Sequence, residues 1–284
     1  MNILFTHHYP LIHLTNHKII CKEQHGFRKL HSCETQLLEA VNDLAYTLNR
    51  GDQTDLVLLD FSKAFDKVSH KHLLYKLHYY GIQDDVYNWI NDFLTNRTQQ
   101  VVLDNVCSDA SKVLSGVPQG SVLGPLLFLI FINDIPSKIS STIRLYADDV
   151  IIYRCIKSYE DALRLQEDID TLSEWADTWL MTFNLTKCEH LTVTNKRSLI
   201  NSSYKIHDHM VQQVTSTKYL GVTINHNLSW SNHITQICSK ANSVLAFLRR
   251  NLRQCSTAVK SLAYFTYVCT ANSRICIYSM VSTY

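Results

Sequence analysis

Tyr146-Ala147-Asp148-Asp149-Val150 places two adjacent acidic residues between segments that favour β-strands. Residues 142–146 and 150–153 on either side predict a tight hairpin that carries both carboxylates at its tip. Neighbouring carboxylates repel each other and raise each other's pKa unless a cation or a hydrogen-bond donor offsets the charge. A divalent metal ion would do so, although an isolated Asp-Asp pair is more often an ordinary turn.

A third acidic residue stands at the end of a short apolar run. Residues 55–60 read Asp-Leu-Val-Leu-Leu-Asp, which predicts a buried central strand with Asp60 at its carboxyl end. If this strand neighbours the hairpin, Asp60, Asp148 and Asp149 converge over one sheet. Oxygen ligands of this kind suit Mg²⁺. Two such ions can activate a 3′-hydroxyl and stabilise a leaving pyrophosphate, so the pattern predicts phosphoryl transfer.

The remaining periodicity predicts a chain of mixed helices and strands. Ser32 is a candidate helix cap, and apolar residues at three-to-four spacing follow it as far as Gly51. Further helices are expected over residues 69–80 and 84–94, from Pro125, over 158–180 and beyond Ser231. Strands are expected at residues 99–103 and 112–114, which form a hairpin, and near residues 191–194, 204–206, 211–214 and 218–224.

Two further features lie close to these acids in the predicted order. Phe65 follows Asp60 by five residues, where a bulky ring can exclude a sugar 2′-hydroxyl, although periodicity alone favours a core Phe. The stretch 115–121 contains Gly116, Pro118, Gln119 and Gly120, and its glycines allow a backbone to approach a nucleotide or template closely. Such a Gly-Pro-Gly loop is a weak signal by itself.

The composition is that of an ordinary globular protein. The 284 residues are 46% hydrophobic and 18% charged, with a net charge of +2. From Met181 onward there are eleven Lys or Arg against two acids, which predicts either a surface for polyanions or a solvated basic face. The nine Cys include no C-x-x-C pair, and no secretory signal or span of membrane length is visible, so an intracellular protein without membrane association is expected.

The motifs together resemble the reverse transcriptase of non-LTR (LINE-like) retrotransposons. The resemblance rests on residues 58–68 (LLDFSKAFDKV), 115–121 (SGVPQGS) and 146–149 (YADD) in that order, and it covers residues 20 to 265. It implies an α+β right-hand polymerase with a ferredoxin-like palm, partial fingers and a helical thumb. It also implies an RNA template, a DNA primer and dNTPs as partners, and two Mg²⁺ ions as cofactors.

Each site residue is assigned through these motifs. The resemblance implies that Asp60 and Asp148 are metal ligands, with Asp149 as the third acid. Phe65 corresponds to the steric gate, and residues 116–120 to the loop that contacts template and nucleotide. The weaker correspondences are Arg28 to a triphosphate-binding arginine, Lys187 to a lysine that can donate a proton, and Tyr219, Leu220 and Gly221 to the primer grip.

The resemblance also divides the chain into parts. Residues 1–55 are expected to form partial fingers, 56–228 a palm-centred core and 229–284 a thumb whose cations hold the template–primer backbone: Lys240, Arg249, Arg250, Arg253 and Lys260. The first fingers motif, an endonuclease, a zinc knuckle and an RNase H segment are not recognisable in the sequence. Residues 269–276 also depart from the family pattern, so a truncated or frame-shifted copy is a hypothesis.

Two other functions remain open at this point. A viral-type RNA-dependent RNA polymerase shares the paired-acid hairpin, but Phe65 disfavours it because NTP use needs room at the 2′ position. A catalytically dead relic that at most binds RNA through its basic thumb is the alternative from a different class. The intact acids favour the enzyme, and the short fingers favour the relic.

Overall fold

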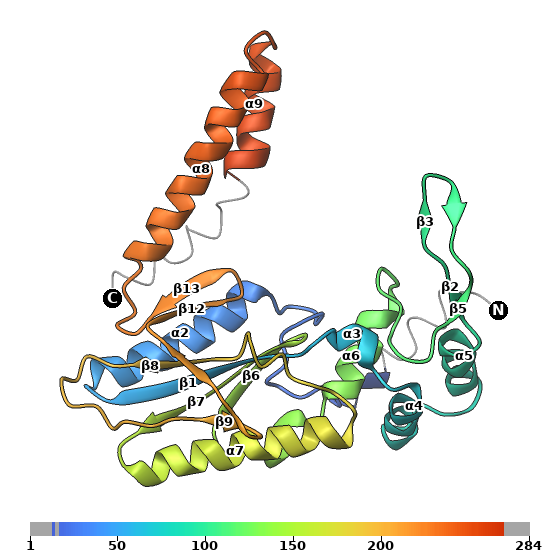
Figure 1. The fold of residues 1–284 in the computed structure, drawn as a ribbon, viewed down its shortest axis with the longest axis horizontal. Helices are drawn as coiled ribbons and strands as arrows, with labels where there is room; N and C mark the ends of the chain where they lie inside the picture. Colours follow the sequence, from blue (N-terminus) through green and yellow to red (C-terminus); the bar gives the residue numbers. More distant parts are fainter. Residues whose placement is uncertain (1–12, 15–16, 270–284) are drawn as a thin grey trace.

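A computed structural model of the chain describes residues 13–14 and 17–269, and it combines helices with a central sheet (Figure 1). The helices are α2 (Cys33–Asn49), α3 (Ala64–Lys67), α4 (His70–Tyr79), α5 (Asp84–Leu94), α6 (Leu123–Ile132), η1 (Ile135–Lys138), α7 (Tyr159–Thr178), α8 (Ser231–Asn251), α9 (Thr257–Tyr264) and η2 (Phe265–Cys269). The strands are β1 (Gln53–Asp60), β2 (Thr98–Gln99), β3 (Val102–Leu103), β4 (Val106–Cys107), β5 (Ser111–Lys112), β6 (Thr142–Tyr146), β7 (Asp149–Ile156), β8 (Glu189–Val193), β9 (Lys205–Ile206), β10 (His209–Met210), β11 (Gln212–Val214), β12 (Ser216–Tyr219) and β13 (Val222–Asn225). The expected α+β class is therefore confirmed.

The central strand of the main sheet is β1. The strand order is β11-β8-β1-β7-β6, and β1 pairs antiparallel with β7 on one side and β8 on the other. Both faces of β1 are covered by other elements, which explains its continuous apolar run. The expectation that residues 55–60 form a buried central strand ending at Asp60 is confirmed.

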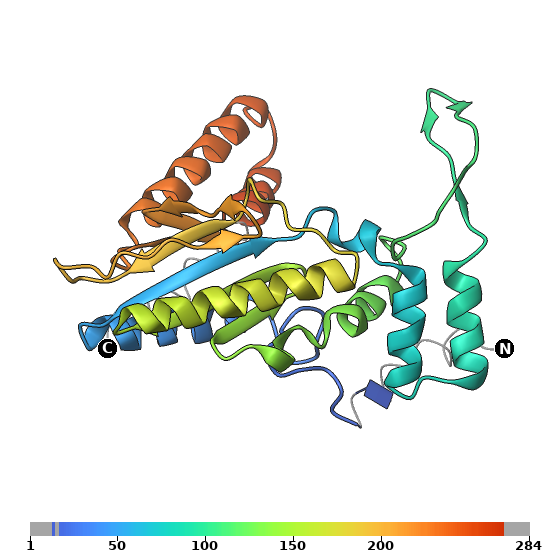
Figure 2. The same ribbon diagram turned by 60° about the horizontal axis from the view of Figure 1, so that its bottom comes forward.

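The two faces of the sheet pack against different layers. Alternate residues of a strand point to opposite faces, so Val57 and Leu59 contact the core that contains α6 and α7. Leu56 points the other way, into a second core formed with α2 and the β12–β13 hairpin. Figures 1 and 2 show α7 along one side of the sheet and α2 with β12 and β13 along the other.

A local capping signal explains where α2 begins. Ser32 caps α2 through its hydroxyl, which accepts from the Thr35 amide, while the Thr35 hydroxyl accepts from the Ser32 amide. Residues 123–132 form the apolar helix α6, nine of whose ten residues are buried. The expected helices over residues 69–80, 84–94 and 158–180 are confirmed as α4, α5 and α7 to within two residues at each end.

One strand prediction was wrong. Residues 218–224 form parts of two strands, because the chain reverses between Tyr219 and Val222, which pair with each other. The two residues between them, Leu220 and Gly221, have φ angles of +45° and +87°. This is a two-residue hairpin turn, in which Gly is favoured because positive φ is sterically free for it.

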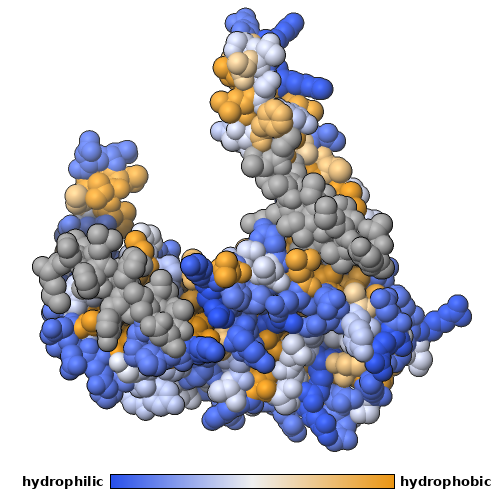
Figure 3. Space-filling model, turned by 180° about the vertical axis from the view of Figure 1, so that it is seen from behind, coloured by the Kyte–Doolittle hydropathy of each residue, from blue (hydrophilic) through white to orange (hydrophobic). Residues whose placement is uncertain are grey.

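Two projections rise from the body on either side of a hollow (Figure 3). One is a two-stranded arm, residues 98–112, in which β2 pairs with β5 and β3 with β4 around the turn at Asp104-Asn105. The other consists of α8 and α9, which pack against each other. Apolar side chains are exposed on both: Val101, Val102, Leu103 and Val106 on the arm, and Phe247, Leu262 and Tyr264 on the helices.

The division into domains stays a prediction. Leu37, Val41 and Leu44 of α2 are buried in the same core as Leu56 of β1, so a boundary at residue 55 would divide a shared core. The expected departure of the C-terminus from the family pattern falls mainly on residues 270–284, which lie outside the described residues. In the part of the chain that the structure describes, no helix is both long and apolar enough to cross a membrane.

Candidate active site

Asp60 and Asp149 lie side by side on one face of the sheet. The register of β1 and β7 pairs Asp60 with Asp149, and directly opposed residues of antiparallel strands point to the same face. That face is the one covered by α2 and the β12–β13 hairpin, because Leu58 and Ile151, one step along the ladder on the same face, pack there. The sheet thus holds two carboxylates at the open end of this layer.

Asp148 occupies a different position from its neighbour. Tyr146 pairs with Asp149, so Ala147 and Asp148 form the two-residue turn and Asp149 is the first residue of β7. The expected hairpin is confirmed, but only Asp148 lies in its turn. Burial and the charge of Asp60 raise the pKa of the Asp148 carboxyl, while its own backbone amide and Lys187 lower it.

The three acids are close enough to influence one another. The pKa of Asp149 is raised from 3.8 to about 6, first by desolvation and then by the charges of Asp148 and Asp60, while Lys187 opposes this shift. Carboxyls with raised pKa values at the end of a cleft are typical of functional sites. The arrangement concentrates negative charge that a cation would stabilise.

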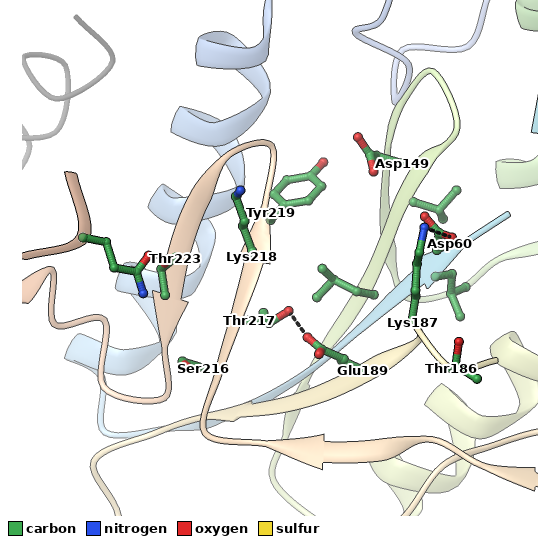
Figure 4. Close-up of a pocket in the computed structure, with 14 residues that line it drawn as sticks. Asp60, Asp149, Thr186, Lys187, Glu189, Ser216, Thr217, Lys218, Tyr219 and Thr223 are labelled. Atoms are coloured by element: carbon green, nitrogen blue, oxygen red, sulfur yellow. Dashed lines mark hydrogen bonds and ion pairs between the residues drawn. The ribbon is translucent and has the colours of Figure 1, made fainter. Parts of the chain in front are cut away.

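Lys187 is the cation nearest these acids in the described structure, and its Nζ lies 3.4 Å from Oδ2 of Asp60. Figure 4 shows the two side chains pointing toward each other. The segment before Lys187 is attached to the end of β1, since the Asn184 amide donates to the Asp60 carbonyl at 2.7 Å and the Ser62 amide to the Thr182 carbonyl at 2.8 Å. Lys187 is therefore presented from a fixed loop, with a side chain that is 65% exposed.

A cleft of about 520 Å³ opens beside the acids, between the sheet and the β12–β13 hairpin. In it, the Thr217 hydroxyl donates to Oε2 of Glu189 at 2.5 Å (Figure 4). Its walls bring together residues that the sequence separates widely: Leu58, Leu59, Asp60, Asp149, Val150, Thr186, Lys187, Glu189, Ser216, Thr217, Lys218, Tyr219, Thr223 and Gln236.

The side chains of the three acids have the chemistry of ligands for a hard divalent cation. Asp60, Asp148 and Asp149 offer only carboxylate oxygens, and their mutual repulsion is a cost that a bound cation would remove. In the conformation described for residues 13–14 and 17–269, no three His, Cys, Asp or Glu side chains meet closely enough to ligate one ion. Asp60 is instead directed toward Lys187.

Phe65 lies just beyond the acids, on α3. Its ring stacks on Phe128 of α6 with centroids 4.2 Å apart, and the ring of Phe27 lies edge to face with it at 6.4 Å. The ring is half-buried, so one part of it packs on the core while another part remains accessible. The stacking on Phe128 agrees with a core role for Phe65, and its role as a steric gate stays a prediction.

The loop formed by residues 116–120 is fastened to the segment that carries Phe65. The amide of Val117 donates to the Phe65 carbonyl at 2.9 Å, and Nε2 of Gln119 donates to Oδ1 of Asp66 at 2.8 Å. Gly116 has a φ of +92°, and a Cβ there would lie 2.8 Å from the Asp66 carbonyl oxygen. Glycine is thus required at Gly116 for both conformation and space.

Residues 10–224 match the family described as "Reverse transcriptase (RNA-dependent DNA polymerase)". The chain belongs to the reverse transcriptase family. This family generally uses divalent metal ions, in agreement with the chemistry of the three acids.

Curated relatives show which kind of reverse transcriptase the chain resembles. The RNA-directed DNA polymerase from mobile element jockey of Drosophila melanogaster is 34% identical over 229 residues, which are 78% of this chain and 25% of that protein. The probable RNA-directed DNA polymerase from transposon BS of the same species is 28% identical over 271 residues, which are 90% of this chain and 29% of that protein. These are non-LTR elements, so the resemblance inferred from the motifs is confirmed. The chain spans about a quarter of the length of these relatives.

Solved structures agree on the fold. Telomerase from Candida tropicalis, in complex with a fragment of telomeric RNA, matches 98% of this reverse transcriptase and 47% of its own chain, with a TM-score of 0.57 and 12% identity. The Candida albicans telomerase complex matches 99% of this chain and 48% of its own, with a TM-score of 0.52 and 11% identity. At this identity, the likeness concerns the fold alone.

Arg28 of the reverse transcriptase lies apart from the cleft. Its Nη1 donates to the carbonyls of Cys21 at 2.8 Å and Gln24 at 2.9 Å, so part of the guanidinium holds its own turn together. With Phe27, whose ring contacts that of Phe65, it lines a second cavity of about 660 Å³. Arg28 is not among the residues that line the cleft, and its proposed contact with a triphosphate stays a prediction.

Tyr219 lines the cleft but is almost completely buried. Its hydroxyl accepts from Nε2 of Gln36 at 3.3 Å, which ties the β12–β13 hairpin to α2. Leu220 and Gly221 form the turn of that hairpin, as described above. The structure therefore gives Tyr219 a packing role, and a contact between these three residues and a primer stays a prediction.

Sequence reasoning missed three residues that hold the site. Gln24 and Gly26 contact the backbone of Ala147, and Asp66 accepts from Gln119 of the loop. All three contacts join segments at least 53 residues apart, so no local periodicity marks them. The available signal was their position within motifs: Gln24 and Gly26 precede Arg28, and Asp66 follows Phe65.

Proposed function

We propose that this chain is the polymerase domain of a non-LTR retrotransposon protein and that it extends a DNA primer on an RNA template. The observation that carries the proposal is the convergence of Asp60, Asp148 and Asp149, where burial and then the charges of Asp148 and Asp60 raise the pKa of Asp149. The family match and the jockey relative support the reaction type. An RNA template, a DNA primer and dNTPs are the proposed substrates.

Asp60 and Asp148 would hold divalent ions, with Asp149 as the third acid. Two bound Mg²⁺ ions would supply activation of the primer 3′-hydroxyl and charge stabilisation of the departing pyrophosphate. The side chains of the protein would then neutralise negative charge and orient the substrates. Without an ion, Lys187 partly offsets the negative charge, since its Nζ lies 3.4 Å from Asp60. Its exposed ammonium is also a candidate proton donor to the leaving pyrophosphate.

Specificity for deoxynucleotides is proposed for Phe65. Its stacking on Phe128 fixes the ring just beyond the end of β1, where a ribose 2′-hydroxyl would require space. The loop with Gly116, Pro118, Gln119 and Gly120 is fastened beside it and offers backbone and amide groups to the base pair that forms. This arrangement favours the reverse transcriptase over an RNA polymerase, because NTP use needs an open 2′ position.

We further propose the right-hand division of the chain. The sheet with Asp60 and Asp149 serves as palm, the N-terminal segment with Arg28 belongs to the fingers, and α8 with α9 serves as thumb. The thumb would hold the template–primer through five exposed cations: Lys240, Arg249, Arg250, Arg253 and Lys260. Three of them, Arg249, Arg253 and Lys260, line a groove of about 610 Å³ between the two helices. Such contacts act on the phosphate backbone, and binding should weaken strongly with added salt.

The test is primer extension on an RNA template with Mg²⁺ and dNTPs. The wild type should extend the primer, and Asp148→Ala should reduce extension by at least about a thousandfold, because charge stabilisation of the transition state is lost. Asp109→Ala, an exposed acid on the arm, is the matched control and should extend normally. Equal extension by the wild type and Asp148→Ala, or selective use of NTPs, would contradict the proposal. The first result would favour a non-catalytic relic and the second an RNA polymerase.

A further inference from the structure

Gln24 contacts the turn that carries Asp148. Its side chain is 1% exposed, and its Oε1 accepts from the Ala147 amide at 2.9 Å while its Nε2 donates to the Ala147 carbonyl at 3.4 Å. The Gln24 carboxamide thus forms hydrogen bonds with both the amide and the carbonyl of Ala147. The backbone beside it extends this attachment, since the Leu145 amide donates to the Glu23 carbonyl and the His25 amide to the Leu145 carbonyl, both at 2.9 Å.

Ala147 is the residue of the turn that needs such support. Its φ of +54° lies in the left-handed region, which is strained for a residue with a Cβ. Gly26 approaches the same residue so closely that a Cβ on it would lie 2.4 Å from the Ala147 nitrogen. The Gly26 amide also donates to Oε1 of Gln24 at 2.6 Å, so the carboxamide is itself held in place.

We propose that Gln24 is a positioning residue for Asp148: it holds Ala147 in the left-handed conformation and thereby aims the adjacent carboxylate toward Asp60 and Asp149. The inference rests on the proposed polymerase function. Gln24 cannot act on substrate directly, because it is buried and both ends of its carboxamide bond to backbone groups. A small displacement of a reacting group is costly in rate, so a loosened turn should lower kcat rather than substrate affinity.

A matched control lies at the opposite end of β1. Gln53 is also fully buried. Its carboxamide likewise bonds to both backbone groups of Ile200, accepting from the amide at 3.0 Å and donating to the carbonyl at 2.9 Å. Removing either carboxamide therefore leaves comparable backbone groups without partners. Only Gln24 is attached to the turn that carries Asp148.

The experiment compares Gln24→Ala with Gln53→Ala in the full chain. Both should lower the melting temperature by a similar amount. For Gln24→Ala, kcat should fall about tenfold or more with KM for dNTP within about twofold, whereas Gln53→Ala should keep the kcat of the folded wild type. Adding Ala147→Gly to Gln24→Ala should restore at least about threefold in kcat, because Gly adopts positive φ without strain. A kcat loss no larger than that of the control, or no restoration by Ala147→Gly, overturns the inference.

A second measurement does not depend on activity. Hydrogen–deuterium exchange of the peptide spanning residues 145–150 should accelerate in Gln24→Ala and stay unchanged in Gln53→Ala. Peptides from α7 report on global opening in both variants. If the wild type fails to extend a primer but the turn exchanges faster only in Gln24→Ala, the polymerase proposal fails and the role of Gln24 in the turn stands. Unchanged exchange at the turn overturns that role whatever the activity.

Discussion

The backbone of Asp60 lies directly opposite that of Asp149 in the β1–β7 ladder. Opposed Cα atoms in an antiparallel pair are separated by about 5 Å, so the strands themselves hold the two carboxylates near each other. Rotation of the side chains can relieve the repulsion only in part. The fold therefore holds two repelling charges close together in its central sheet.

Asp149 should make stability depend on pH. Its carboxyl has a pKa raised from 3.8 to about 6 in the folded chain. Because the folded state then binds the proton more tightly than the unfolded state, stability falls as the pH rises from 3.8 to about 6. Asp149→Asn should therefore raise the melting temperature at pH 7 and change it less at pH 4, measured by differential scanning fluorimetry. Asp109→Asn should show no such pH-dependent gain, and an equal gain at both pH values would contradict the assignment.

Lys187 should set the pH at which activity falls on the acidic side of the profile of kcat/KM against pH. Its charge lowers the pKa values of both Asp148 and Asp149. Lys187→Met should let these values rise, so the acidic limb of kcat/KM against pH should move upward by about half a unit or more. Lys218→Met removes a cation from the same cleft and serves as the control. A limb that shifts equally in both variants would mean that the general charge of the cleft, and not Lys187, controls the acids.

Phe65 should control the choice of sugar. Phe65→Val keeps an apolar residue on α3 but opens space beyond the acids, so the ratio of NTP to dNTP incorporation should rise about tenfold or more. Single-nucleotide primer extension with each substrate gives this ratio. Phe183→Val is the matched control, since Phe183 is also half-buried and stacks on Phe61 with centroids 4.7 Å apart. An unchanged ratio in Phe65→Val would leave Phe65 with a packing role only.

Gly116 should be indispensable for the loop. Gly116→Ala adds a Cβ 2.8 Å from the Asp66 carbonyl oxygen at a φ of +92°, whereas Gly120→Ala, at +77°, meets no atom within 4 Å. Strain at positive φ alone costs about 1–2 kcal/mol, so Gly120→Ala should lose about that much stability and Gly116→Ala clearly more. Urea unfolding measures the difference. Equal losses would show that the loop can move away from Asp66 at little cost.

Local sequence signals were sufficient where neighbouring residues decide the structure. The capping box at Ser32 and the apolar spacing after it predict α2, and the strand-forming residues around Asp148 predict the hairpin. The β12–β13 turn was missed because apolar alternation continues through it. Leu220 rarely adopts positive φ, so Gly221 was the sole turn signal, and Gly also occurs within strands.

Long-range contacts account for what the sequence could not give about the site. The acids were predicted because each ends or begins a recognisable strand. The bond between Gln24 and Ala147 joins residues 123 positions apart, and it depends on a parallel bridge between Gln24 and Leu145 that no local pattern indicates. The packing of Tyr219 on Gln36 is similarly distant, at 183 positions. The position of Tyr219 in its motif predicts a primer contact, whereas its buried hydroxyl bonds to Gln36 of α2.

The central place of β1 has a consequence for synthesis of the protein. Both hydrogen-bonded neighbours of β1 come much later in the chain, β7 at Asp149–Ile156 and β8 at Glu189–Val193. At a translation rate of about 5–20 residues per second, a ribosome needs on the order of ten seconds between completing β1 and completing β8. Until β7 is complete the apolar strand has neither partner, and until β8 is complete it still lacks one, so nascent chains should depend on a chaperone or on low temperature to avoid aggregation.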